Sequence, residues 1–178
     1  MEAEQILEGD LEENTQYLTF VLAGEEYAID ILKVQEIRGF ERTTRIPNTP
    51  DYLLGVINLR GAVVPIVDLR VRFSLAADDN STAVIILVKL AKELGGRVIG
   101  IVVDGVSDVH AISSDDVSDT PDLASNVVKM FVTGLASIGE KMIIMLDIDS
   151  LIASGVLDHK LLAGEEEQER EQKLSTAG

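Results

Sequence analysis

Short apolar runs separated by turn residues dominate the body of the chain. QYLTFVLAGEEYAIDILKV has two runs on either side of Gly24-Glu25, and ILVKLAKELGGRVIGIVVDGV has two more around Gly95-Gly96. Runs of this length, rich in Val, Ile and Leu and bounded by Gly, Asp, Asn or Pro, are typical of strands joined by hairpins. The pattern predicts an all-β body with short helical turns near Pro50 to Leu54, Ser113 to Val117 and Asp149 to Ala153.

The body also contains an internal repeat. GVINLRGAVVPIVDL at 55–69 aligns without a gap on GLASIGEKMIIMLDI at 134–148, a shift of 79 positions. Upstream, VQEI at 34–37 matches VSDV at 106–109. Two unrelated apolar hairpins can align this well, but the same features recurring in the same order favour one unit present twice.

Each copy is too small to bury a stable core as an open sheet. We therefore expect two small barrels of about five strands each that pack on one another. The first barrel is expected over about 16–74 and the second over about 82–152. An acidic, flexible lead over 1–15 and an acidic helical or disordered tail over 156–178 complete the predicted organisation.

The first copy carries an Arg-Gly corner and a proline within its apolar hairpin. Gly61 supplies the positive φ that a tight turn needs, so the side chain of Arg60 is expected to point outward. Proline lacks a ladder donor, which predicts an edge or a bulge at Pro65. Arg60 is then either a solvated turn residue or a docking point, and the second copy differs here, with Gly139-Glu140 at its corner and Ile144 at the proline position.

Composition and charge exclude several classes of function. The chain has no Cys and no Trp and a formal charge of −16, so it lacks thiolate metal sites and the basic, aromatic surface that nucleic-acid binding requires. Runs such as AVIILV and MIIML are far shorter than the roughly 18 residues that cross a bilayer. We expect a soluble, cytoplasmic protein that binds no nucleic acid and inserts into no membrane.

Candidate catalytic residues are few. The two histidines, His110 and His159, form no metal or nucleophile motif. Asp68 and Asp147 occupy equivalent places in the repeat, which leaves two interpretations: a carboxylate pair of a hydrolytic enzyme, or caps of the turn after each strand. A third hypothesis is a small-ligand module, which would need a deep closed cavity.

Three segments together resemble the CheW coupling proteins of bacterial chemotaxis. They are EEYAIDILKVQEIRG, TRIPNTPDYLLGVINLRGAVVPIVDLR and RVIGIVVDGVSDV, and the match covers roughly residues 16–155. The resemblance implies two five-stranded SH3-like barrels related by pseudo-twofold symmetry. It also implies a non-catalytic adaptor, without cofactor or metal, that is recruited to membrane-bound receptor arrays.

The implied partners are the regulatory domain of the histidine kinase CheA and the cytoplasmic tips of methyl-accepting chemoreceptors. Carried over onto this sequence, the kinase-facing contacts are the apolar residues Leu18, Ile31 and Val34. The receptor-facing groove between the barrels is expected to involve Glu36, Gly55, Arg60, Gly100 and Val109. On this view the Arg60-Gly61 corner docks a receptor helix.

Overall fold

The computed structural model describes residues 14–75, 80–120 and 131–153 and confirms an all-β protein. The strands are β1 (Asn14–Leu22), β2 (Glu25–Asp30), β3 (Val34–Gly39), β4 (Leu53–Leu59), β5 (Ala62–Asp68), β6 (Val84–Lys89), β7 (Val98–Val103), β8 (Gly105–Ser113), β9 (Val117–Ser118), β10 (Val132–Ile138) and β11 (Lys141–Leu146). Short helical segments are η1 (Ile31–Lys33), α2 (Leu69–Arg72), η2 (Lys92–Leu94), η3 (Ser114–Asp116) and α4 (Ile148–Leu151). No helix within these described ranges is long and apolar enough to cross a membrane.

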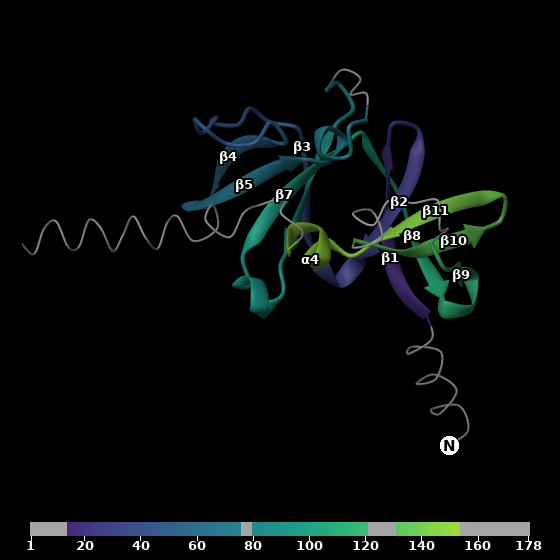
Figure 1. Cartoon of the computed structure of the whole chain (residues 1–178). Coiled ribbons are helices and arrows are strands. Elements are labelled where there is room, and N and C mark those ends of the chain that lie inside the picture. The colour runs from purple at the N-terminus through teal and green to yellow at the C-terminus, as the bar shows by residue number, and fades with distance from the viewer. Residues whose placement is uncertain (1–13, 76–79, 121–130, 154–178) are drawn as a thin grey trace, which may run out of the picture.

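The strands form two sheets that lie side by side with α4 between them (Figure 1). One sheet has the order β8-β1-β2-β11-β10-β9 and is called barrel A, and the other has the order β3-β6-β7-β5-β4 and is called barrel B. The predicted pair of small barrels is therefore confirmed. Barrel A has a sixth strand, the two-residue β9, whose place in barrel B is taken by a single bridge between Thr44 and Val56.

Each barrel draws strands from both halves of the chain. Barrel A combines β1 and β2 with β8 to β11, and barrel B combines β3 to β5 with β6 and β7. The expected split into barrels over 16–74 and 82–152 is corrected by this exchange. Its physical reason is that the parallel pairs, β2 with β11 and β5 with β7, each join strands from different copies.

The internal repeat is confirmed by the pairing registers. The hairpins β4–β5 and β10–β11 both show a register shift, at Leu53/Gly55 in one and at Val132/Gly134 in the other. If β1 corresponds to β6, β2 to β7, β3 to β8, β4 to β10 and β5 to β11, the two sheets have the same strand order. The two halves are thus related by a pseudo-twofold exchange of strands.

Alternation along the strands divides the buried apolar residues into three clusters. One cluster fills barrel B and includes Ile66, Ile85 and Leu87, and another fills barrel A and includes Ile143 and Met145. The largest cluster combines residues of both barrels, because the opposite faces of strands such as β1, β6 and β7 point into the seam. Burial between the barrels, at about 25 cal/mol per Å² of apolar surface, holds them together.

Most of the local predictions agree with the structure. Both predicted hairpins form, the first with its turn at Ala23-Gly24 and the second around Gly95-Gly96, and helical turns form at η3 and α4. Near Pro50 to Leu54 a single turn forms, in which the Leu53 N–H donates to the Pro50 carbonyl at 3.0 Å, but it does not extend into a helix because Leu53 already begins β4. The predicted lead over 1–15 is described only at its last two residues, and the tail over 156–178 lies outside the described residues.

The prediction that Pro65 marks an edge or a bulge is wrong. β5 lies inside its sheet, between β7 and β4. Hydrogen-bonded and non-hydrogen-bonded pairs alternate along β4 and β5 from the turn-closing pair Leu59 and Ala62. Pro65 falls in a non-hydrogen-bonded pair, so its nitrogen faces away from β4. Pairing with β7 begins only at Ile66. The ring therefore lies on the β7 side of β5, just before the first pair of the ladder with β7.

Candidate docking surfaces

Arg60 projects from the tip of the β4–β5 hairpin. Arg60 and Gly61 both have positive φ, 53° and 87°, the combination that a type I′ turn requires. The Arg60 side chain is 82% exposed, and its guanidinium lies 3.8 Å from the carboxylate of Glu36 on β3. The hairpin is thus a rigid support that presents a cation to solvent.

A second arginine completes this charged surface. Arg38 lies 3.6 Å from Glu36 and 3.4 Å from Glu41. We call Glu36, Arg38, Glu41 and Arg60 the hairpin-tip patch. Such surface ion pairs contribute little to stability, so these charges remain available to a partner.

Three of the predicted contact residues are buried, which corrects their expected role as direct contacts. Leu18 is 2% exposed and belongs to the core between the barrels. Gly55 is buried with φ +139°, and a Cβ there would overlap Thr44 O and lie 2.7 Å from Thr44 C. A Cβ at Gly100 would lie 2.9 Å from Cγ2 of Ile85 inside barrel B. These residues shape the barrels, and none of them exposes a side chain to solvent.

The remaining apolar candidates lie around η1. Ile31 and Val34 are half-buried and pack against the core between the barrels. Leu32 between them is 85% exposed, more than any other large apolar side chain in the described part of the chain. We call Ile31, Leu32, Lys33 and Val34 the η1 patch, and Leu32 and Lys33 are the members that the sequence interpretation did not name.

Val109 lies on β8 of barrel A, 44% exposed, and pairs with the buried Leu18 of β1. Gly55 and Gly100 both pair with Ile66, on either side of it in barrel B. Among the five residues predicted for the receptor groove, the structure therefore brings together Glu36 with Arg60 and Gly55 with Gly100. Val109 belongs to the other barrel and joins neither pair.

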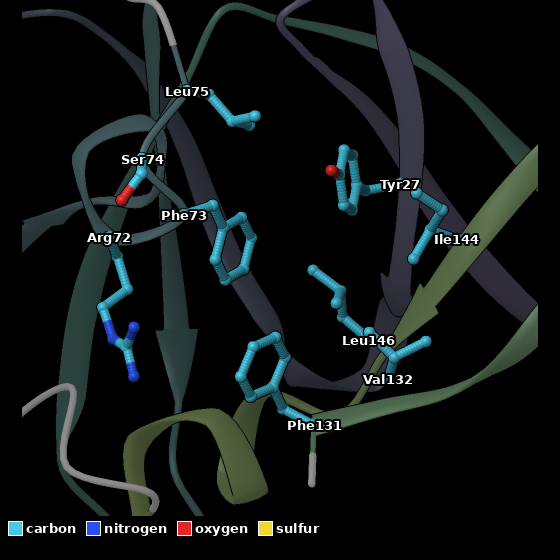
Figure 2. Close-up of a pocket in the computed structure, with 9 residues that line it drawn as sticks. All are labelled: Tyr27, Arg72, Phe73, Ser74, Leu75, Phe131, Val132, Ile144 and Leu146. Atoms are coloured by element: carbon cyan, nitrogen blue, oxygen red, sulfur yellow. The ribbon is translucent and has the colours of Figure 1, made fainter. Parts of the chain in front are cut away.

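An apolar pocket of about 330 Å³ opens at the seam between the barrels. Figure 2 shows the ring of Phe73, which follows α2, close to the ring of Phe131, which precedes β10, and their centroids are 5.4 Å apart. Tyr27 stacks on the other side of Phe73 at 6.0 Å, and burial, with a contribution from Glu25, raises the pKa of its phenol. The pocket is lined by Tyr27, Arg72, Phe73, Ser74, Leu75, Phe131, Val132, Ile144 and Leu146.

Arg70 is a buried cation that sequence reasoning did not identify. Its guanidinium is 2% exposed and contacts Asp68 at 2.9 Å and Asp104 at 3.1 Å, and it donates to Oδ1 of Asn80 at 2.8 Å. The pKa of the Arg70 guanidinium is raised above its ordinary value, mainly by its hydrogen bonds to Asp68. The sequence did mark this position, because the two copies carry opposite charges there. The residue two positions after the Asp that ends the strand is the cation Arg70 in one copy and the acid Asp149 in the other.

Asp68 and Asp147 act as helix caps. Asp68 Oδ1 accepts from the Arg70 backbone N–H at 3.0 Å, and Asp147 accepts from the N–H groups of Asp149 and Ser150. Among the described residues the structure records no contact between the two carboxylates, and no group of three or more potential ligands could hold a metal ion. The capping interpretation is confirmed, and the geometry gives the carboxylate-pair hypothesis no support.

Comparison with known proteins assigns the class. A family model described as CheW-like domain matches residues 16–156. The chain is 49% identical over 141 residues to a chemotaxis protein CheW of Klebsiella aerogenes, covering 78% of this chain and 82% of that protein. It is 39% identical to a chemotaxis protein CheW of Rhizobium meliloti, covering 78% and 88%.

A solved structure agrees with the sequence relatives. The scaffolding protein TtCheW from Thermoanaerobacter tengcongensis superposes with a TM-score of 0.69 at 33% identity, covering 78% of this chain and 92% of that one. The family match, the relatives and the solved structure together assign the chain to the chemotaxis scaffolds or adaptors. The chain belongs to the CheW family.

Proposed function

We propose that this adaptor couples the cytoplasmic tips of chemoreceptors to the regulatory domain of the histidine kinase CheA. The η1 patch serves as the kinase-facing surface, and the hairpin-tip patch, with Val109, serves the receptor. The protein catalyses no reaction and acts in the cytoplasm at receptor arrays. Control of the kinase is then a coupling free energy between the two interfaces.

The observation that carries the proposal is a difference between two equivalent hairpin tips. β4–β5 ends in Arg60-Gly61, whereas β10–β11 ends in Gly139-Glu140. Both tips are exposed, so neither charge is needed for packing. A guanidinium on only one of two equivalent tips is what a specialised docking face would show, because arginine is enriched among residues that dominate interface energies.

Binding assays with Arg60 variants test this function. Purified protein is combined with a chemoreceptor signalling fragment and a CheA regulatory domain, separately and together. We expect Arg60→Ala to weaken receptor binding at least tenfold while the melting temperature stays within a few degrees. Lys89→Ala, which removes an exposed cation from β6 of the same barrel, is the matched control and should bind as the wild type does. Unchanged receptor binding by Arg60→Ala contradicts the assignment.

A further inference from the structure

The two barrels are joined by a carboxylate contact at the tip of the β1–β2 hairpin. Asp104, on the crossover from β7 to β8, accepts from the backbone N–H of Ala23 at 2.7 Å through Oδ2. Its Oδ1 accepts from Arg70 at 3.1 Å. The contact links a hairpin of barrel A with α2, which follows β5 of barrel B. We call Ala23, Arg70 and Asp104 the first clip.

A second clip occupies the pseudo-symmetric place. Asp149 of α4 accepts from the backbone N–H of Ala91 at 2.8 Å, and Ala91 lies at the tip of the β6–β7 hairpin of barrel B. The other oxygen of Asp149 forms an ion pair with Lys33, on the crossover from β2 to β3. The hydrogen bond with Asp149 raises the pKa of the Lys33 ammonium.

Both clips are built from the same three structural positions, but the charges at two of these positions are exchanged. Each has a hairpin-tip N–H, a helix residue two positions after a capping Asp, and a crossover residue. In the first clip the helix residue is the cation and the crossover residue the acid, and in the second clip the order is reversed. The fold therefore does not dictate which of these two positions carries the acid and which carries the cation.

The two clips differ in burial and in the number of their contacts. Arg70 is 2% exposed and is held by Asp68, Asp104 and Asn80. The Lys33 and Asp149 side chains are 32% and 23% exposed, where water screens an ion pair and competes for it. The first clip is thus suited to be permanent and the second to be releasable.

We propose that Lys33 and Asp149 are positioning residues that set the angle between the barrels, with the first clip as the fixed side of the hinge. Lys33 belongs to the η1 patch, beside Leu32, so a partner that docks there covers Lys33. An acidic group of that partner competes with Asp149 for the ammonium. This regulatory step rests on the proposed kinase-facing role of the η1 patch, whereas the hinge itself does not.

The angle is measured between spin labels in the protein without partners. The chain has no cysteine, so Val63→Cys and Met142→Cys place labels at repeat-equivalent positions, 51% and 53% exposed, one on each barrel. Pulsed electron resonance then reports the distance distribution. We expect one narrow distribution in the labelled parent and a distribution at least twofold wider in Lys33→Met and in Asp149→Asn. Asparagine keeps an acceptor for the N–H of Ala91.

A charge exchange and a matched control complete the test. Lys33→Asp combined with Asp149→Lys copies the polarity of the first clip and should restore the narrow distribution. Lys141→Met removes a comparable ion pair, to Glu26 at 3.3 Å within barrel A, and should leave the width unchanged. If the parent and both single variants share one width, narrow or broad, the proposal is overturned.

The regulatory step has its own readout. The affinity for a receptor signalling fragment is measured with and without a CheA regulatory domain, and the ratio gives the coupling factor. Asp149→Asn, which breaks the same ion pair from outside the η1 patch, should reduce a wild-type coupling factor at least threefold toward unity, with the receptor affinity measured without the CheA domain within twofold of wild type. An unchanged coupling factor overturns this step. A chain that binds neither fragment contradicts the proposed function, and the distance distributions still decide the hinge.

Discussion

At the scale of single residues, two equivalent glycines explain how the barrels close. A Cβ at Gly55 would overlap the carbonyl of Thr44, and a Cβ at Gly134 would lie 2.8 Å from the carbonyl of Ser118. Thr44 bridges to β4 and Ser118 pairs with β10, so each glycine admits the segment that covers an otherwise open sheet edge. Close backbone approach is a general reason for glycine inside a strand.

Replacing Gly55 by Ala is expected to destabilise the fold itself. The new Cβ meets backbone atoms of Thr44, and φ stays in a region that side chains rarely adopt. We expect a loss of about 2 to 4 kcal/mol in the free energy of unfolding, measured by urea denaturation. Gly39→Ala, at a site with no atom within 4 Å and no positive φ, should change stability by less than about 1 kcal/mol. Equal stability of the two variants would contradict this account.

Turn and cap residues could be predicted at this scale, whereas the buried arginine could not. Gly61 and Asp68 act through neighbours one to three positions away, so their roles follow from local sequence. Arg70 pairs with Asp104, which is 34 positions distant, and only the fold brings the two together. The buried positions of Leu18 and Gly100 could not be predicted either, because burial depends on which strands become neighbours.

At the scale of elements, hairpins followed from their turns, but strand positions did not. Tyr52 and Leu53 looked like the end of a helical turn after Pro50. Leu53 donates to the Pro50 carbonyl at 3.0 Å, but the Tyr52 carbonyl accepts from Asp68 at 2.7 Å, which draws the segment into the sheet. Pairing with β5 therefore overrides the local preference.

The contrast between Pro65 and Ile144 gives a reciprocal prediction for the two hairpins. Ile144 occupies the proline position of the second copy, but there the parallel ladder includes it, opposite Tyr27 of β2. Its N–H faces β2, so Ile144→Pro should remove a ladder bond and cost about 2 to 3 kcal/mol, measured by thermal or urea unfolding. Pro65→Ile should cost less than about 1 kcal/mol, since the ladder with β7 begins only at Ile66 and contains no pair at position 65. Ile144→Val controls for the loss of apolar volume, and a larger loss from Pro65→Ile than from Ile144→Pro would contradict the register argument.

At the scale of the whole molecule, duplication could be predicted but strand exchange could not. The shift of 79 positions establishes which residues are equivalent, and the pairing registers agree with it. Equivalence does not say whether β1 and β2 complete their own barrel or the other one, because both arrangements bury the same strands. The largest apolar cluster lies between the barrels, so the two behave as one folding unit.

Strand exchange predicts how the chain behaves when it is cut in the middle. A fragment of residues 1–77 holds β1 to β5, but β1 and β2 pair with β8 and β11 of the remaining fragment, 78–178. Neither fragment should form a folded monomer, and an equimolar mixture should recover a cooperative melt by circular dichroism. Light scattering coupled to size exclusion separates a folded monomer from a homodimer in which a second copy supplies the exchanged strands, an outcome that the pseudo-twofold symmetry permits. A cooperative melt of monomeric 1–77 would show that the first copy folds alone and that the exchange is not required.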